Sequence, residues 1–560
     1  MTVDLEGRVC IPSKVFVESD EFRRMLESAK ASRRFSDLSA MIVDATETSR
    51  WDVFRFLQRE VLHLGAVSVA TLLDEAGFGN VKAVYEVLTP DYDYTMENPD
   101  LIGVSAIVTN VPFANRKIEY FRRTKPDALI VAGGAGYAYC PEIPIRHGAD
   151  FVVKGKAEHA LLALLNKIVS KREDGRSLRA AFLGLNNVNV QGVYDGTGMR
   201  GDVDYALMVK DLDAVPAINY NLIQGKQSKN MRSIRDSEGC TNRCDFCSSV
   251  LLHRNKYRTV SVEKIVEEMR KAKQEGIGQV FFVGDHAFGR KYEEIEALTY
   301  TIEAANLDMS WVAQATISSI YNNLDKGIID RLEKSRCSVL CLGVESVYDD
   351  DLAKMNAERK SSREQLKRVL GALRASPIEV HAMLVLKPIV DKDKREILPF
   401  SAENTDTGIV KYRQEIKETV KFLKHYNVRS AQFHSAIPLP GTKSEQNFLN
   451  AGIVLKKVGG KTVSRAKYTG QYVVASANPL ESHGIMRRAY EGFYSAGYIL
   501  NPLVKLFIPS PKNRLSQIFF RALGRGTVYA HLHSKEYKEY VSALEKGDFE
   551  FYKPGERIAC

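Results

Sequence analysis

Two stretches of the chain alternate short apolar runs with amphipathic helical segments, and this rhythm constrains the fold more than any other feature. The first alternation occupies residues 41–171, and the second occupies residues 231–450. Short apolar runs joined by helices are typical of parallel strands buried between helical layers. Both stretches are therefore predicted to be α/β, each built on one parallel sheet.

The first stretch is predicted to be a doubly wound, Rossmann-like domain. Its expected strands are 41–45, 81–87, 101–109, 128–134 and 150–155. Residues 1–40 are interpreted as an N-terminal extension with one helix near 21–31. Residues 172–230 are interpreted as an irregular linker that holds a small strand pair.

The second stretch is predicted to be an open barrel of six strand–helix units, because it holds too few strands for a closed eight-stranded barrel. Its expected strands are 231–237, 279–285, 309–316, 337–346, 378–387 and 430–442. Residues 451–560 are expected to form a separate, mostly helical region.

The bulk composition is that of a globular protein of several domains, with 560 residues, 44% hydrophobic and 26% charged. No apolar run reaches the roughly 18–20 residues of a membrane-spanning helix. The N-terminus has no secretory pattern, so a cytoplasmic location is expected. The 79 basic residues are scattered among 69 acidic ones without a long Lys/Arg run, which disfavours nucleic acid as a partner.

Three of the eight cysteines, Cys240, Cys244 and Cys247, fall within eight residues directly after the first expected barrel strand. Such clustering indicates a metal site in a reducing compartment. Three thiolates can hold a 4Fe–4S cube and leave one iron open to another ligand. A zinc site with His253 as a further ligand is the alternative. Two other cysteines, at 337 and 341, share one face of a buried strand and are interpreted as core thiols.

The pattern Cys-x3-Cys-x2-Cys after a first barrel strand resembles the radical S-adenosylmethionine (SAM) superfamily. The resemblance covers about residues 231–450. It implies a 4Fe–4S cluster whose open iron binds S-adenosylmethionine, and a 5′-deoxyadenosyl radical that abstracts hydrogen from substrate. It further implies an electron donor such as flavodoxin or ferredoxin. Phe246, before the last cysteine, is expected near the adenine.

Other positions are carried over from the same resemblance. Asp285, at the end of the second strand, is expected near the methionine amino group. Glu345 and Ser346, in a Gly-x-Glu-Ser pattern at the end of the fourth strand, are expected near the ribose, and Gln314, at the end of the third strand, is expected to point to that same pocket. Asp285 and Glu345 could instead be ordinary helix caps.

Residues 41–171 resemble the cobalamin-binding domain that precedes the radical domain in one large subfamily. The resemblance implies cobalamin contacts from small residues at the ends of strands and in turns, at Ser105, Gly133, Gly134 and Gly155. Small residues let a backbone approach a flat macrocycle. Lys156 departs from the subfamily's Gly-Glu-Gly-Glu pattern, and no Asp-x-His-x-x-Gly motif is present. A Rossmann-like domain without the cofactor is the alternative.

Five basic residues and no acidic ones lie between Lys505 and Arg525. Leu515 and Phe519 share one helical face, while Arg521 falls on another. Docking of this helix on the barrel with a solvated basic face is favoured over contact with an anionic membrane.

Three functions follow as hypotheses. The first is cobalamin-dependent radical methylation of an unactivated carbon in a small molecule or lipid. The second is a radical cyclase or C–C bond-forming enzyme acting on a lipid or tetrapyrrole. The third is a metal-binding protein without catalysis.

Overall fold

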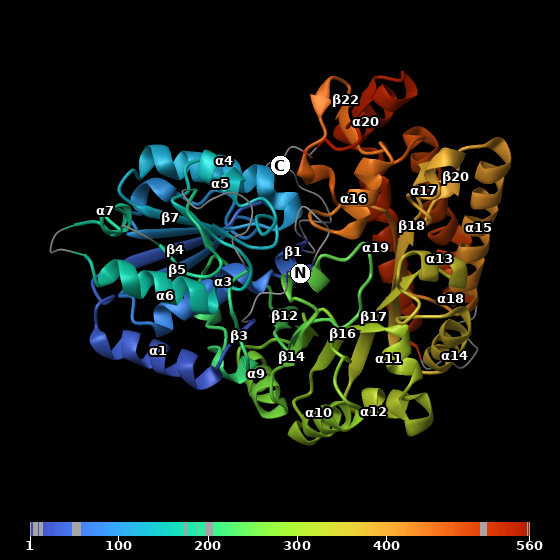
Figure 1. Ribbon diagram of the computed structural model, residues 1–560. Helices are drawn as coiled ribbons and strands as arrows, with labels where there is room; N and C mark the ends of the chain where they lie inside the picture. The colour runs from blue at the N-terminus through green and yellow to red at the C-terminus, as the bar shows by residue number, and fades with distance from the viewer. Residues whose placement is uncertain are drawn as a thin grey trace.

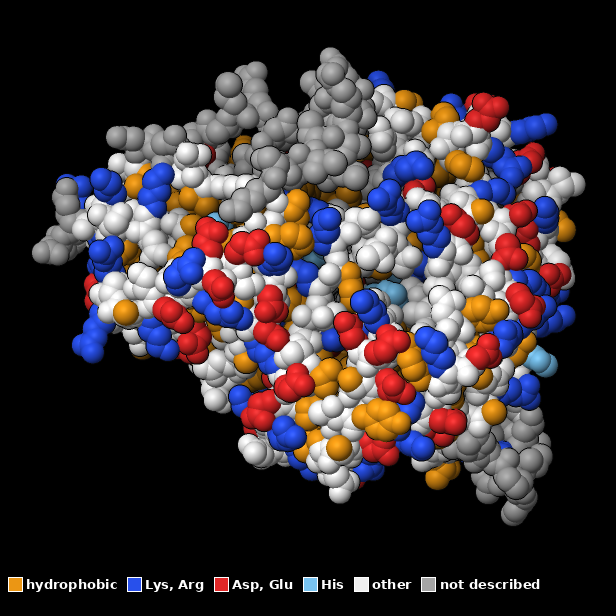
Figure 2. All heavy atoms as spheres, turned by 60° about the horizontal axis from the view of Figure 1, so that its bottom comes forward, with side chains coloured by type: hydrophobic (Ala, Val, Ile, Leu, Met, Phe, Trp, Pro, Cys, Tyr) orange, Lys and Arg blue, Asp and Glu red, His pale blue; other side chains and the backbone are white. Residues whose placement is uncertain are grey.

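The computed structural model describes residues 2–3, 9–10, 15–46, 58–172, 176–185, 188–196, 205–504, 512–556 and 558. Figure 1 shows the N-terminal α/β part in blue to cyan beside the green and yellow barrel strands, with the orange and red C-terminal segments packed against the barrel. In the described part of the chain, no helix combines the length and apolarity needed to cross a bilayer. Acidic and basic side chains are interspersed over the face shown in Figure 2.

The N-terminal part holds a seven-stranded sheet in the order β11-β5-β4-β6-β7-β8-β9. Its strands are β4 (Ser39–Asp44), β5 (Asn80–Tyr85), β6 (Leu101–Ser105), β7 (Leu129–Gly133), β8 (Phe151–Val153), β9 (Val193–Tyr194) and β11 (Ile223–Gln224). All neighbours pair in parallel except β8 and β9. The five predicted strands are all present, and the doubly wound sheet is confirmed.

Both edges of this sheet come from the segment expected to be an irregular linker. The edge strands β9 and β11 lie within residues 172–230, and β10 (Met208–Val209) pairs with β3 (Phe16–Val17) near the N-terminus. Helix α1 (Ser19–Ser32) matches the expected N-terminal helix and contacts α6 (Ala157–Val169). Short edge strands have too little periodicity to be distinguished from loop by sequence alone. The expected extension and linker are therefore structural parts of the first domain.

The barrel sheet has six parallel strands in the order β12-β15-β16-β17-β18-β21. They are β12 (Met231–Ile234), β15 (Gln279–Phe282), β16 (Ser310–Thr316), β17 (Cys337–Glu345), β18 (Glu379–Leu386) and β21 (Ser430–Ser435). Every one begins and ends inside its predicted range. Because β12 and β21 are the two edges and do not pair, the open barrel is also confirmed.

Tyrosine hydroxyls cover the open edge of the barrel at β21. Tyr490, in α17 (Pro479–Phe493), accepts from the amide of Phe433 at 3.1 Å. The Tyr494 hydroxyl, directly after α17, accepts from the amide of Ala431 and donates to its carbonyl, both at 3.0 Å. An edge strand otherwise presents unpaired backbone groups, so these bonds close the edge without a further strand.

The C-terminal region is mainly helical and also contains a small antiparallel sheet. The sheet joins β23 (Lys461–Thr462), β22 (Leu455–Val458) and β24 (Phe549–Phe551). Its helices after α17 are α18 (Ala496–Val504), α19 (Arg514–Leu532) and α20 (Lys535–Glu545).

The amphipathic helix α19 packs beside β21, as docking predicted, but with the opposite face inward. Arg521 is fully buried, whereas Leu515 and Phe519 are 70% and 62% exposed. The expectation of a solvated basic face is therefore wrong at Arg521, because buried carbonyl and amide partners at the barrel edge accept its hydrogen bonds.

Replacing Tyr494 with phenylalanine should lower the free energy of unfolding by about 1–3 kcal/mol, since it leaves a buried amide and carbonyl without their partner. Urea unfolding measures the loss. Tyr300→Phe is the control, because its side chain is 52% exposed. Equal stability of the Tyr494 variant and the wild type would contradict the proposed covering of the edge.

Candidate functional site

A cavity of about 500 Å³ lies between the first domain and the barrel. Strand β4 pairs with β5 on one side and β6 on the other, so the strand order reverses beside it. Open α/β sheets bind ligands at such switch points, outside the carboxyl ends of the strands. The predicted residues that line this cavity are Ser105, Gly133, Gly134 and Gly155 from the first domain, and Asp285 and Gln314 from the barrel. Two sets of residues predicted separately thus meet in one cavity.

Glycine occupies the positions that line this cavity for different reasons. Gly134 has φ +93°, and a Cβ there would lie 2.5 Å from the carbonyl oxygen of Ala106. Gly155 has φ +106°, which also disfavours any side chain. At Gly133, a Cβ would meet its nearest neighbour, the Val153 carbonyl oxygen, at an ordinary 3.7 Å. The backbone therefore does not require glycine at position 133, and the missing side chain leaves room for a ligand.

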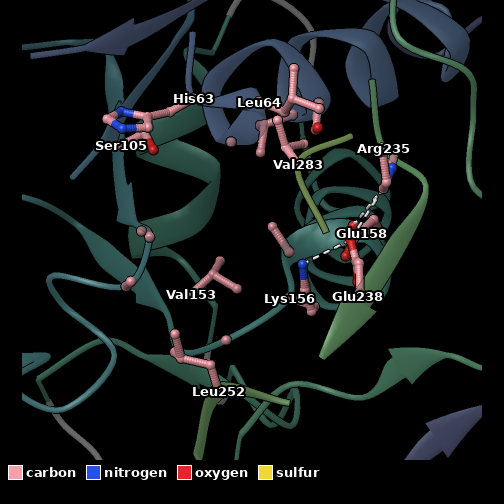
Figure 3. A pocket seen from close by; sticks show the side chains of 18 of the residues that line it. His63, Leu64, Ser105, Val153, Lys156, Glu158, Arg235, Glu238, Leu252 and Val283 are labelled. Carbon is pink, nitrogen blue, oxygen red and sulfur yellow. Dashed lines mark ion pairs between the residues drawn. The ribbon is translucent and has the colours of Figure 1, made fainter. Parts of the chain in front are cut away.

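A charge network connects the two walls of the cavity. Lys156, at the start of α6, lies 2.8 Å from Glu238 of β13 (Ser237–Gly239), with the distance measured from Nζ to Oε1. The other oxygen of Glu238 accepts from Arg258 at 2.5 Å, and Arg235 lies 3.5 Å away. Figure 3 shows Lys156 and Glu238 pointing toward one another, and Arg235 paired with both Glu158 and Glu238. Lys156, which departs from the expected pattern, has its partner in the other domain.

These cations control the ionisation of Glu238. Burial alone would raise the pKa of its carboxyl group. The positive charges of Lys156, Arg258 and Arg235 outweigh burial and hold the pKa well below the ordinary value. Glu238 is consequently an ionised, buried carboxylate placed two residues before Cys240.

Asp285 contacts the start of the cysteine loop. Its carboxylate accepts from the amide of Gly239 at 3.1 Å and lies 3.3 Å from Nε2 of His253. The turn before it requires Gly284, where a Cβ would lie 2.0 Å from the Ser237 hydroxyl. Asp285 thus faces the cavity while tying β15 to the residue that precedes Cys240.

The cysteine loop runs from the end of β13 into α8 (Ser249–Leu252). Cys240, Cys244 and Cys247 are free thiols, and Asn242 donates to the sulfur of Cys240 at 3.3 Å. Burial raises the pKa of Cys244 to about 12, while the nearby Lys360 ammonium opposes that shift. Three free thiols on one loop, with a cation beside them, are a donor set that fits a cluster with one open iron.

The described residues contain no three His, Cys, Asp or Glu side chains that converge on a single metal ion. A cube places each thiolate on a different iron, so the sulfurs need not converge on one point. His253, the candidate further ligand of the zinc alternative, pairs with Asp285.

Glu345 ends β17 in an unusual backbone conformation, with φ +58°. Its carboxylate lies 2.5 Å from the ammonium of Lys360. A Cβ at Gly343 would lie 2.7 Å from that carboxylate, so a larger residue there would displace the Glu345–Lys360 pair. Burial acts to lower the pKa of Lys360, but Glu345 and the thiols of Cys244 and Cys247 raise it above its ordinary value. A strained, charge-paired strand end is a combination that recurs at functional sites.

Phe246, Glu345 and Ser346 lie outside the main cavity. Phe246 lines a second cavity of about 490 Å³, and the Lys360 nitrogen lies 5.8 Å from its ring centre. The Ser346 hydroxyl donates to Asp351 at 3.0 Å and lines a smaller cavity against α15 (Asp406–His425). The structure thus brings Phe246, Lys360 and Glu345 together and turns Ser346 toward a helix.

Sequence reasoning did not single out several polar residues of the site. These are Arg235, Glu238, Lys360 and His63, which lines the cavity 4.0 Å from Asp44. The only available signal was position, because Glu238 lies directly before the Gly-Cys start of the loop. The others approach through tertiary folding.

Glu238→Gln should lower the free energy of unfolding by about 3–5 kcal/mol, because three cations then lose their shared carboxylate. Lys156→Met should cost less, about 1–2 kcal/mol, because Glu238 keeps its arginines. Urea unfolding at neutral pH compares the two. The folded pKa of Glu238 lies below the unfolded one, so its contribution is lost as the pH falls and the Gln variant should differ less from wild type below about pH 4. Equal costs for both variants would contradict the network.

Two family models match the chain. Residues 53–165 match the B12 binding domain, and residues 234–400 match the radical SAM superfamily. An uncharacterized methyltransferase of Pyrococcus horikoshii is 24% identical over 71% of this chain and 79% of its own length. Bacteriochlorophyllide d C-8(2)-methyltransferase of Chlorobaculum tepidum is 20% identical over 66% and 72%.

The fold matches a solved structure over most of its length. The radical S-adenosylmethionine methyltransferase TsrM of Kitasatospora setae, with cobalamin and a [4Fe-4S] cluster bound, aligns over 88% of this chain and all of its own, with a TM-score of 0.59 at 14% identity. At this identity the likeness concerns the fold. Together with the two matched domains and the cysteine loop, it shows that the chain belongs to the radical SAM superfamily and is an enzyme whose radical domain follows a B12-binding domain.

Proposed function

We propose that this enzyme transfers a methyl group to an unactivated carbon of its substrate, using cobalamin, a 4Fe–4S cluster and S-adenosylmethionine. The observation that carries the proposal is the shared cavity. Gly133 and Ser105 of the B12-binding domain face Asp285 and Gln314 of the radical domain across it. Methyl transfer requires the methyl carrier and the radical source to reach the same carbon, which one shared cavity permits.

Each group has residues in the structure that suit it. Cys240, Cys244 and Cys247 would hold the cluster, and the small residues at the ends of β6 and β7 would accept the corrinoid. When bound, the cluster and S-adenosylmethionine supply a carbon radical and the corrinoid supplies the methyl group. The protein binds, orients and excludes water, and it leaves bond breaking to the cofactors.

Individual side chains receive roles by position. Asp285, fixed to Gly239, would accept a hydrogen bond from the amino group of S-adenosylmethionine. Glu345, held by Lys360, would accept from the ribose hydroxyls, and Phe246 would lie against the adenine. Gln314 would contact the ligand from the third strand. Ser346 would not contact the ligand and would instead hold the end of β17 in place through its hydrogen bond to Asp351.

The substrate class follows from the relatives only in outline. Two of them are named methyltransferases, and one of these acts on a bacteriochlorophyllide. We propose a small molecule or lipid as substrate and a one-electron donor such as flavodoxin or ferredoxin, in a reducing cytoplasm that spares the cluster. A radical cyclase of the same architecture is the second candidate, because the shared cavity suits any carbon radical.

Anaerobic enzyme, reconstituted with iron, sulfide and hydroxocobalamin, tests the reaction. With a reductant and S-adenosylmethionine labelled in its methyl group, we expect 5′-deoxyadenosine and label in a product one methylene heavier than the substrate. Extracts of a deletion strain supply the substrate pool. A product lighter by two hydrogens and free of label would replace methylation with cyclisation, and Cys244→Ala, the control, should yield neither product.

Filling the cavity at Gly133 should block corrinoid uptake. Gly133→Val places a branched side chain where an added Cβ makes only an ordinary 3.7 Å contact with the Val153 carbonyl oxygen, so the fold should persist and the bound corrinoid, read by its visible absorption, should fall at least about 10-fold. Gly278→Val is the matched control, because it is exposed and has no atoms within 4 Å of an added Cβ. Undiminished corrinoid in the Gly133 variant would place the cofactor elsewhere.

A further inference from the structure

The C-terminal helix α19 is inverted with respect to an ordinary surface helix. Arg521, on its inner side, is fully buried and donates to the Tyr498 carbonyl at 3.0 Å and to the Asn427 side chain at 2.7 Å. Lys512, just before the helix, is also buried and lies 3.8 Å from Glu379. Two basic side chains of this segment, Lys512 and Arg521, are thus buried rather than solvated.

The outer side of α19 carries a row of exposed apolar side chains. Leu515, Phe519 and Tyr529 are 70%, 62% and 61% exposed. The exposed Ala522 and Gly526 lie between them, and spacings of four and three residues put all five on one helical face. At 1.5 Å per residue, the row from Leu515 to Tyr529 is about 21 Å long. Such an arrangement contradicts the usual placement of apolar side chains and marks a contact surface.

The neighbouring helix α18 extends this surface. Arg514 and Arg525 of α19 donate to the carbonyls of Pro502 and Tyr494, so the two helices run antiparallel side by side. Leu500 of α18 is 49% exposed. We name the surface made by Leu500, Leu515, Phe519, Ala522 and Tyr529 the apolar stripe.

Basic side chains flank the apolar stripe, and the surrounding sequence lacks acidic residues. Residues 496–535 contain no aspartate or glutamate, while two of their six lysines and arginines, Lys512 and Arg521, are buried. Arg525 is exposed beside the stripe, and Arg514 is half-buried at its beginning. Over the whole chain the two signs nearly balance, with 79 basic and 69 acidic residues, so forty residues without an acid are a local feature.

We propose that the apolar stripe lies on an anionic membrane surface, with its side chains among the lipid headgroups and the flanking arginines on the phosphates. Apolar area combined with basic flanks is what interfacial helices use to bind anionic lipid. Pairing of this segment with the same segment of a second copy would bring its arginines together, because residues 496–535 contain no acidic group to face them. The described helices are not long and apolar enough to span a bilayer, so the enzyme would lie on the membrane.

Flotation with vesicles tests the proposal on the full chain. The vesicles are phosphatidylcholine alone, or equal parts of phosphatidylcholine and phosphatidylglycerol. We expect binding to the anionic vesicles, weakened by salt, and little binding to the neutral ones. Leu515→Glu with Phe519→Glu should lower the partition coefficient at least about 10-fold. The matched control, Leu183→Glu with Val410→Glu, changes two side chains of similar exposure (62% and 61%) on other helices and should bind like wild type.

A second measurement does not depend on loss of binding. The chain has two native tryptophans, so quenching is measured relative to wild type. Brominated lipids in anionic vesicles should quench the added emission of a Phe519→Trp variant, whereas the added emission of Tyr300→Trp, at an exposed site away from the stripe, should not be quenched. Absence of binding to anionic vesicles, undiminished binding of the Leu515/Phe519 variant, or an unquenched indole in the Phe519→Trp variant would each overturn the proposal. A dimer in light scattering that only the Leu515/Phe519 variant abolishes would also overturn it and assign the stripe to a second copy.

Discussion

The carboxylate of Glu238 holds the two halves of the site in one arrangement. It is buried, it precedes the cysteine loop by two residues, and it meets Lys156 from the B12-binding domain as well as Arg258 from its own hairpin strand β14 (Tyr257–Thr259). A buried carboxylate is tolerated only with such partners, because desolvation of an unpaired charge costs several kcal/mol. The domains are therefore joined by an interaction that operates only when the first domain faces the cluster loop.

The bonds of Glu238 to both domains explain why one wall of the cavity comes from the B12-binding domain and the other from the barrel. The strand ends of a doubly wound sheet form a crevice wherever they occur, and the mouth of an open barrel forms another. Lys156 and Glu238 bring these two crevices together, and Asp285 adds a bond to the Gly239 amide from the barrel side. A methyl carrier and a radical source held apart by even a few ångströms would not serve one carbon, so domain orientation is itself part of the catalytic apparatus.

The C-terminal region solves a different problem, namely the exposed edge of the open barrel. Tyr490 and Tyr494 satisfy the backbone of β21, and the buried Arg521 continues the same polar contacts along α19. Because Arg521 is used inward, Leu515, Phe519 and Tyr529 of α19 remain outside, while Val528 packs against the core. The covering of the barrel edge and the apolar stripe are thus two consequences of one packing arrangement.

The sequence by itself determined the parallel strands, the cysteine loop and the small residues at strand ends. Buried parallel strands are continuous apolar runs, and a cluster loop is local in sequence, so periodicity and spacing were sufficient to predict them. Only the tertiary structure decided that residues 172–230 supply both edges of the first sheet, that Lys360 pairs with Glu345, and that Arg521 is buried while Phe519 is exposed. Each of these depends on a partner distant in the chain: the amphipathic pattern of α19 is the same with either face inward, and the hydrogen-bond acceptors of the barrel edge determine which face is buried.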